Sequence, residues 1–278
     1  MTTREYLAQV LELLQVDAKK SLGQNFLVSD HVVNKIITAV QKNQMDHLIE
    51  IGPGPGALTR HLFEGDYQLT LIELDRMFSK YWKEKLEEKV GTFQKVLIEQ
   101  DALRADWDSI ILKEKNNFLV SNLPYQISSS ILIDRSIDEN PLVGMALMFQ
   151  KEVAQRIKSN SKDSNYGMLS VVAQTFWKIE TLLEASSGDF SPSPKVASRV
   201  LTFERKETQI IDKKRFLKFV KQCFVHPRRM MIGNLQEGHL VKDQLLQVFK
   251  ELEISEKTRP QELKVIQFEK LYFKLYSS

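Results

Sequence analysis

The sequence predicts an α/β protein with a mostly parallel β-sheet, helices on both faces of that sheet, and a small helical C-terminal domain. From residue 47 to about residue 205, short apolar runs alternate with amphipathic stretches, which is typical of strands joined by helical crossovers. After residue 205 the pattern is helical only. We therefore expect one domain at 1–205 and a second at 206–278, a division that suits a chain of 278 residues.

The expected elements follow one another in a regular order. Short apolar-rich runs predict the strands 47–51, 68–72, 95–99, 118–121, 144–149, 180–184 and 199–204. The amphipathic stretches predict helices at 168–177, 213–224 and 242–252. They also predict a helix that begins at about residue 57, one that ends at about residue 90, one that begins at residue 128 and one that ends at residue 158. Ligands of such sheets bind at the carboxyl ends of the strands, so the residues that follow the strands are the candidates for a site.

The composition is that of an ordinary globular protein, with 42 % hydrophobic and 27 % charged residues. The single cysteine, Cys223, cannot form a disulfide within the chain, which favours a reducing compartment. The N-terminus has no basic start followed by an apolar block, and the near-apolar run at 142–149 is too short to span a bilayer. These features predict a cytoplasmic protein.

The charge is unevenly distributed along the chain. Residues 205–278 carry 16 lysines and arginines against 9 acidic residues, a net charge of +7, whereas residues 1–204 have a net charge of −4. No acidic residue lies between Lys213 and Gln236. A solvated helix face would also account for a basic run, but this density favours a polyanionic partner. The candidate contacts in this stretch are Lys221, Arg228 and Arg229.

A glycine-rich loop follows the first predicted strand. Gly52 and Gly54 stand at alternate positions in this loop, where they let the backbone pass close to a ligand. Glu73 ends the second strand, where a carboxylate can accept hydrogen bonds from ribose hydroxyl groups. Asp101 follows the third strand and can accept a hydrogen bond from an adenine amine. These features predict a nucleoside-containing cofactor, but they fit nicotinamide and S-adenosylmethionine proteins alike.

The motif Asn122-Leu123-Pro124-Tyr125 follows the fourth predicted strand and separates these two cofactor classes. The exocyclic amine of adenine is a poor nucleophile because its lone pair is delocalised into the ring. An enzyme that methylates it can orient the lone pair by accepting both amine hydrogens, one on the Asn122 side-chain oxygen and one on a main-chain carbonyl near Leu123. Pro124 would fix the turn, and Tyr125 would stack on the base.

This chemistry predicts S-adenosylmethionine as the cofactor and needs no strong general base, because the attacked nitrogen becomes acidic and loses its proton to solvent. The five scattered histidines predict neither a catalytic triad nor a metal site. A base inside a helix is unreachable, so the target base must be flipped or unpaired. Phe190 is a candidate for the second stacking face, and Lys195 and Arg199 are candidates for phosphate contacts. A packed loop aromatic and two solvated charges are the alternative interpretations.

Ordered motifs along nearly the whole chain resemble the small-subunit ribosomal RNA adenine dimethyltransferases, the kasugamycin-sensitivity type. Besides the glycine loop and the tetrad, the motifs are 20–27, 72–76, 101–103, 148–157, 166–171 and 190–196. The resemblance implies a Rossmann-like class I S-adenosylmethionine methyltransferase fold. It also implies the transfer of two methyl groups to each of two adjacent adenines in a hairpin near the 3′ end of small-subunit rRNA. The expected partner is an assembling small subunit.

Carried over to matching positions, the resemblance assigns the cofactor site to Asn25, Leu27, Gly52, Glu73, Asp101 and Asn122. The assignment of Asn25 and Leu27 to this site rests on the resemblance alone. Two positions depart from the family pattern. Gln126 stands where an asparagine is usual, and the paired arginines at 228–229 are not followed by the lysine and threonine that are common in relatives.

Three other hypotheses remain open at this point. The related erythromycin-resistance type methylates large-subunit rRNA, although Leu123 and the longer C-terminal region favour the small-subunit type. A nicotinamide-dependent dehydrogenase would share the glycine loop and Glu73, but it has no use for the tetrad. A non-catalytic assembly or transcription factor would bind nucleic acid through the basic C-terminal region, and the intact tetrad argues against this. A monomer is the expected state of the protein.

Overall fold

The computed structural model describes residues 1–15, 24–88, 93–238 and 240–276. Contacts divide the chain into two compact units, each built from stretches that are distant in the sequence. Unit 1 comprises Met1–Leu132, Asn140–Ala154 and Ile179–Arg205, and unit 2 comprises Ile133–Glu139, Gln155–Lys178 and Lys206–Ser278. The division expected from the sequence, with cofactor binding in 1–205 and rRNA binding in 206–278, stays a prediction about function.

Within the described residues, a seven-stranded sheet has the strand order β4-β3-β2-β5-β6-β9-β7. The bounds are β2 His47–Ile51, β3 Gln68–Glu73, β4 Lys95–Glu99, β5 Asn117–Ser121, β6 Gly144–Gln150, β7 Trp177–Ala185 and β9 Ser198–Arg205. Strands β4, β3, β2, β5 and β6 are parallel to one another. Strand β9 pairs antiparallel with β6, so that Ser198 at its start lies opposite Gln150 at the end of β6. The predicted mostly parallel sheet is confirmed.

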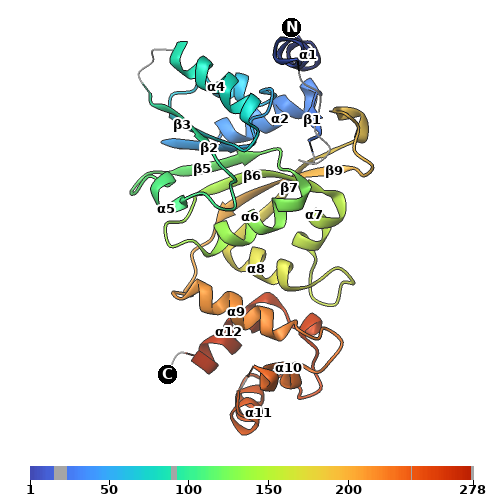
Figure 1. The fold of residues 1–278 in the computed structure, drawn as a ribbon. Coiled ribbons are helices and arrows are strands. Elements are labelled where there is room, and N and C mark those ends of the chain that lie inside the picture. Colours follow the sequence, from blue (N-terminus) through green and yellow to red (C-terminus); the bar gives the residue numbers. More distant parts are fainter. Residues whose placement is uncertain (16–23, 89–92, 239, 277–278) are drawn as a thin grey trace. The chain divides into compact units, whose positions relative to one another are not determined.

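Helices cover both faces of this sheet, as predicted. Figure 1 shows α2 (Asp30–Gln41) and α4 (Arg76–Glu88) on one side, and α5 (Trp107–Ile110) and α6 (Tyr125–Ile137) on the other. The remaining helices near the sheet are α1 (Thr3–Leu14), α3 (Thr59–Leu62) and α7 (Lys151–Lys158). Because both faces are covered, the central strands β2, β3, β5 and β6 are almost entirely buried, which explains their apolar sequence pattern.

Two helices begin elsewhere than predicted. Helix α3 forms only at Thr59–Leu62, because the chain leaves β2 through a turn of glycines with positive φ. Helix α6 begins at Tyr125 rather than at Ser128, since Pro124 lacks an N–H and is well suited to a helix start. The sequence prediction also omitted α1 and α2, although a capping box between Thr2 and Glu5 marks the start of α1.

A second, two-stranded sheet joins two segments that are distant in the sequence. Strand β1 (Phe26–Leu27) pairs antiparallel with β8 (Phe190–Ser191), and Leu27 lies opposite Phe190. The Val28 N–H donates to the Asp189 carbonyl at 2.8 Å, next to the short 3-10 helix η2 (Ser187–Asp189). This pairing anchors the segment that enters the pocket described below.

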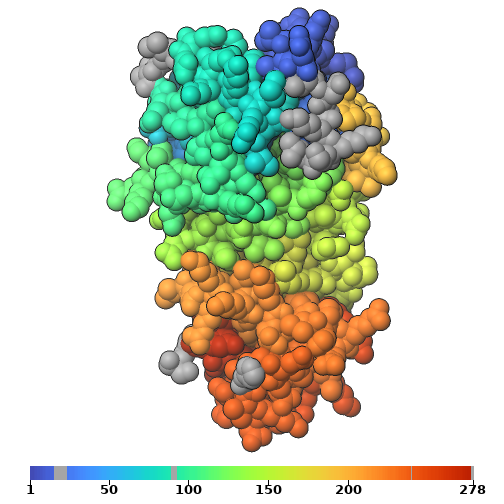
Figure 2. All heavy atoms as spheres, viewed as in Figure 1, coloured from blue at the N-terminus to red at the C-terminus, as the bar shows by residue number. Residues whose placement is uncertain are grey.

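Unit 2 is mostly helical, which confirms the predicted helical C-terminal region. Its helices are α8 (Met168–Phe176), α9 (Lys213–Cys223), α10 (Met231–Glu237), α11 (Lys242–Glu251), α12 (Val265–Tyr276) and the 3-10 helix η3 (Pro260–Glu262). Phe216 is buried at its centre, edge-on to Phe176 and to Tyr272 at ring-centroid distances of 5.9 and 5.2 Å. The residues after about 206 pack into one compact body, coloured orange to red in Figure 2. Within the described part of the chain, no helix is both long and apolar enough to span a bilayer.

Candidate active site

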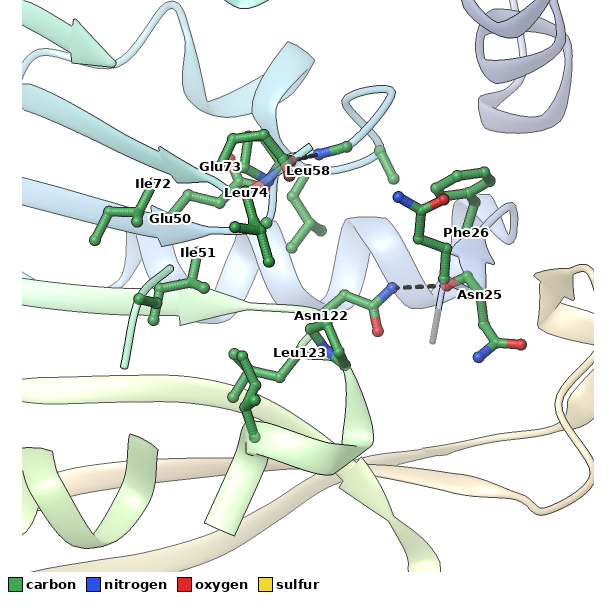
Figure 3. A pocket seen from close by; sticks show the side chains of 18 of the residues that line it. Asn25, Phe26, Glu50, Ile51, Leu58, Ile72, Glu73, Leu74, Asn122 and Leu123 are labelled. Carbon is green, nitrogen blue, oxygen red and sulfur yellow. Dashed lines mark hydrogen bonds between the residues drawn. The ribbon is translucent and has the colours of Figure 1, made fainter. Parts of the chain in front are cut away.

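A pocket of about 300 Å³ lies in unit 1 at the carboxyl ends of β2, β3, β4 and β5 (Figure 3). The strand order reverses at β2, whose neighbours are β3 on one side and β5 on the other, and ligands of open α/β sheets bind at such a point. The volume is within the range of small-molecule sites. The predicted cofactor residues all line this pocket: Asn25, Leu27, Gly52, Gly54, Glu73, Asp101 and Asn122.

The glycine loop after β2 forms one wall of the pocket. Gly52, Gly54 and Gly56 have φ angles of 67°, 51° and 98°, a region that residues with a side chain rarely adopt. The Gly52 N–H donates to the Ile72 carbonyl of β3 at 2.8 Å. The alternate glycines are thus required by the backbone of the turn, and at Gly52 and Gly54 this backbone lines the pocket.

Glu73 ends β3 beside this loop. One carboxylate oxygen accepts the Gly54 N–H at 2.9 Å, and the other accepts the Asp75 N–H at 2.8 Å. The side chain is buried, and burial raises the pKa of Glu73 above its ordinary value, while these N–H groups act in the opposite direction. A carboxylate has about four acceptor sites, so Glu73 can accept ribose hydroxyl hydrogens in addition to these two bonds.

Glu50 is a pocket residue for which the motifs predicted no role. It lies within β2 and is 2 % exposed, and its Oε2 atom has no hydrogen-bond partner among the described residues. Burial, with the neighbouring Glu73 acting in the same direction, raises the pKa of Glu50 to about 8. In the sequence, Glu50 could have been recognised because it is a charged residue within an apolar central strand. The apolar wall residues Phe26, Leu58, Ile72 and Leu74 have no comparable signal.

Asp101 lies just beyond the end of β4 at the same edge of the sheet. Its Oδ1 atom accepts the Leu103 N–H at 2.9 Å, which fixes the orientation of the carboxylate. The side chain is half-buried. Its position beside Ala102 in the pocket wall is suited to accepting a hydrogen bond from an amine of a bound ligand.

Asn122 follows β5, and one hydrogen bond sets the orientation of its amide. Its Nδ2 atom donates to the Asn25 main-chain carbonyl at 3.2 Å, as Figure 3 shows. Because the amide nitrogen is engaged in this way, the side-chain oxygen is the atom available to accept a hydrogen from a ligand in the pocket. Asn25 directly precedes β1, so the β1–β8 pairing holds the carbonyl that orients Asn122.

The rest of the tetrad also lines the pocket. Leu123 is buried, and Tyr125 is the first residue of α6. The Tyr125 hydroxyl is hydrogen-bonded to the Ser198 hydroxyl of β9 at 2.6 Å, and burial raises the pKa of Tyr125 above its ordinary value. The ring is therefore held at both ends, by the helix backbone and by its hydroxyl.

These residues occupy the same edge of a parallel sheet in a chain that matches one family over most of its length. The family of ribosomal RNA adenine dimethylases matches residues 15–275. The chain belongs to this family. The resemblance predicted from the sequence motifs is thereby confirmed.

Individual members of the rRNA adenine dimethylase family agree with this assignment. Ribosomal RNA small subunit methyltransferase A of Bdellovibrio bacteriovorus is 48 % identical to this chain over 274 residues, which cover 97 % of each protein. The crystal structure of a dimethyladenosine transferase from Plasmodium falciparum superposes with a TM-score of 0.75 at 25 % identity, covering 91 % of this chain and 98 % of that one. The 23S rRNA methyltransferase ErmE has the same fold, with a TM-score of 0.64 at 21 % identity, covering 90 % of this chain and 99 % of that one.

In this dimethylase chain, Phe190 lies on the strand that pairs with the pocket-lining strand β1, and it is not itself in the pocket wall. It is 3 % exposed, its backbone pairs with Leu27, and it is not among the described residues that line the pocket. Its predicted stacking role stays a prediction, and the structure adds a packing role in the core of unit 1.

The predicted RNA contacts of the dimethylase chain lie outside the pocket wall. Lys195 is exposed, whereas Arg199 is only 16 % exposed and is ion-paired with Glu184, which also binds Lys151 at 2.9 Å. In unit 2, Lys221 and Arg228 are exposed. Arg229 lies 3.4 Å from Glu237. These roles remain predictions.

Proposed function

We propose that this chain transfers methyl groups from S-adenosylmethionine to the N6 atoms of two adjacent adenines in a 3′-terminal hairpin of small-subunit rRNA, during maturation of the small subunit. The observation that supports this most directly is the Asn122 amide, which is oriented by the Asn25 carbonyl at the edge of the pocket. A dehydrogenase has no use for a carboxamide at this position, whereas an enzyme that methylates an amine needs an acceptor for the amine hydrogens.

S-adenosylmethionine suits the residues that line the pocket. Glu73 would accept hydrogen bonds from the ribose hydroxyl groups, and Asp101 would accept one from the adenine amine. Glu50 Oε2, which has no hydrogen-bond partner in the part of the chain that the structure describes, would be a buried acceptor for the ammonium group of the methionine part. When bound, the cofactor supplies a methyl group on a positively charged sulfur.

The chain itself contributes position rather than acid–base chemistry. Asn122 Oδ1 accepts one amine hydrogen of the target adenine and a main-chain carbonyl near Leu123 accepts the other, so that the nitrogen lone pair is directed at the methyl carbon. Tyr125 stacks on the base, and the bond to Ser198 keeps its ring in place. The target must be flipped out of a helix or already unpaired to enter this site.

The small subunit is the favoured target because relatives that are 32–48 % identical are named small-subunit methyltransferases. The likeness to ErmE concerns the fold alone. We further expect the chain to act in the cytoplasm, as a monomer, on an assembling 30S-type particle to which the basic residues of unit 2 bind.

The deciding experiment incubates the purified protein and S-adenosylmethionine with precursor small subunits that lack the modification, and in parallel with large-subunit rRNA. We expect N6,N6-dimethyladenosine at two neighbouring positions of the small-subunit rRNA, as measured by mass spectrometry of nuclease fragments. Modification of the large-subunit RNA alone would assign the erythromycin-resistance activity instead. Preferential binding of NAD over S-adenosylmethionine, measured by calorimetry, would remove the methyltransferase function.

A further inference from the structure

The glycine loop of the pocket alternates glycine with proline, and the prolines Pro53 and Pro55 fix only their own φ angles. Gly54 stands between them at positive φ and has no side chain, so contacts from other segments of unit 1 help to maintain its conformation. Gly54 has such contacts on both polar groups. Its N–H donates to Glu73, and its carbonyl accepts the indole N–H of Trp82 at 2.8 Å.

Trp82 is itself firmly packed. It lies on α4, is 3 % exposed, and contacts the rings of Tyr81 and Phe63 at centroid distances of 5.0 and 6.0 Å. Its ring also covers Gly56: a Cβ atom at that position would lie only 2.6 Å from the indole. The indole therefore fits against the loop as well as donating to it.

A second tryptophan has the same relation to another loop of the pocket, the one that follows β4. Trp107, the first residue of α5, is 7 % exposed and donates its indole N–H to the Ala102 carbonyl at 2.8 Å. Ala102 and its neighbour Asp101 both line the pocket, on the loop after β4. The same loop is also held by the Gln100 N–H, which donates to the Glu73 carbonyl at 3.0 Å, and by the turn bond from the Arg104 N–H to the Asp101 carbonyl at 2.9 Å.

We propose that Trp82 and Trp107 are positioning residues for the cofactor, each holding one loop of the pocket through a single indole N–H bond to a main-chain carbonyl. This inference rests on the proposed binding of S-adenosylmethionine in the pocket. Neither indole touches the reacting atoms. Their effect is to keep Gly54 and Asp101 in the conformation that accepts the ligand, so that less conformational freedom is lost on binding.

A buried indole N–H usually finds an acceptor, so the bond alone does not distinguish these two residues from an ordinary core tryptophan. The third tryptophan of the chain provides the comparison. Trp177 is 1 % exposed and donates its N–H to the Ser136 hydroxyl, also at 2.8 Å. Both partners belong to unit 2 and neither lines the pocket. Trp177 is thus also a buried tryptophan that donates its indole N–H over the same distance, but its acceptor does not belong to a loop of the pocket.

The test compares Trp82→Phe, Trp107→Phe and the matched control Trp177→Phe in the full-length protein. Binding of S-adenosylhomocysteine is measured by calorimetry, and KM and kcat are measured with S-adenosylmethionine and rRNA. We expect the Kd to rise roughly fivefold to tenfold in each of the first two variants and to stay unchanged in the third, since one net hydrogen bond corresponds to about this factor. We also expect KM for the cofactor to rise while kcat and KM for rRNA stay constant.

Phenylalanine is smaller than tryptophan, so each variant also leaves a cavity. Replacing Trp82 or Trp107 by 3-benzothienylalanine keeps the size and shape of the ring but substitutes sulfur for the N–H group. We expect the same rise in Kd from this isostere. An unchanged Kd in the isosteric variants, or an equal rise in Trp177→Phe, would overturn the proposal. A wild-type protein that fails to bind S-adenosylhomocysteine would instead contradict the proposed function, so the two failures are distinguishable.

Discussion

At the scale of single residues, the orientation of Asn122 depends on one hydrogen bond from its amide nitrogen to the Asn25 carbonyl. An aspartate at position 122 would have nearly the same size. It would have an oxygen where the donor is needed, and this oxygen would face the Asn25 carbonyl oxygen. The carboxylate would therefore turn away from its present orientation.

We predict that Asn122→Asp lowers the single-turnover rate of methyl transfer by about 100-fold or more, because misplacement of a reacting group by an ångström has an effect of this size. The rate is measured with labelled cofactor at saturation. The control is Asn165→Asp, which makes the same change at an exposed position. A variant at position 122 that transfers methyl groups as fast as the wild type would contradict the mechanism.

Glu50 leads to a prediction about pH. Its pKa is about 8 in the folded protein and 4.5 ordinarily, so between these pH values the folded state binds more protons than the unfolded state. The contribution of Glu50 to stability is therefore fully present below about pH 4.5 and is lost as the pH rises to about 8.

We expect Glu50→Gln to become more stable relative to the wild type as the pH rises, by more than about 1.4 kcal/mol between pH 5 and pH 9, because each pKa unit corresponds to this amount. Urea unfolding at pH 5, 7 and 9 measures the difference. The same substitution at the exposed Glu87 serves as the control. A difference in unfolding free energy that is constant with pH would show that Glu50 titrates normally.

At the scale of elements, the small β1–β8 sheet connects the pocket with a segment far along the chain. It places Leu27 in the pocket wall and holds Asn25, while the side chain of Phe190, on the partner strand, packs in the core of unit 1. Packing and base stacking make different demands on position 190. Packing needs apolar volume, whereas stacking needs an aromatic ring.

We predict that Phe190→Ala lowers the free energy of unfolding by about 3–5 kcal/mol, since it removes a buried ring. Phe190→Leu retains most of the apolar volume, so it should cost less than about 1.5 kcal/mol. If the predicted stacking role is right, the leucine variant still loses at least about tenfold in kcat/KM for rRNA. Urea unfolding and steady-state kinetics measure the two effects, and full activity of the leucine variant would restrict Phe190 to packing.

Helix α1 is another element that supports the pocket from outside. Thr3 is fully buried, and both its N–H and its hydroxyl donate to one Asp30 oxygen, at 2.7 and 2.5 Å. These bonds hold the pKa of Asp30 below its ordinary value. Tyr6 of α1 reaches Tyr81, the neighbour of Trp82, with a hydroxyl–hydroxyl distance of 3.3 Å. The N-terminal helix is thus linked to the residue that holds the glycine loop.

At the scale of the whole molecule, the charge asymmetry predicts that affinity for RNA resides mainly in the basic residues after position 205. We expect Arg228→Glu/Arg229→Glu to weaken binding to precursor small subunits by at least about tenfold and to reduce the slope of log affinity against log salt. The double variant Lys257→Glu/Lys270→Glu is the control, because it changes the net charge equally at exposed positions of the same unit.

Filter binding at several salt concentrations measures both quantities. Equal losses in the two double variants would mean that net charge alone matters, and unchanged binding across the salt series would reject this part of the surface as an RNA contact.

Most of the fold could be predicted from the sequence. The predicted bounds of the parallel strands agree with the observed bounds to within about one residue, because strands buried on both faces appear in the sequence as continuous apolar runs. The edge that bears the pocket was also predictable, since Glu73 ends a strand, the glycine loop, Asp101 and Asn122 each follow one, and parallel strands bring their ends together. Short helices such as α5 and the two-residue strands β1 and β8 are too brief to produce a recognisable period.

By itself, the sequence determined the order of the elements, the edge at which the pocket lies and the chemical class of its polar residues, because these follow from local periodicity and from motifs next to strand ends. Only the tertiary structure decided which atoms hold those residues. The bond from Asn122 to the Asn25 carbonyl spans 97 residues, the unpartnered oxygen of Glu50 depends on what surrounds β2, and Trp82 meets Gly54 through the packing of α4. Contacts of this kind depend on how distant segments pack in three dimensions, and no local spacing in the sequence records that packing.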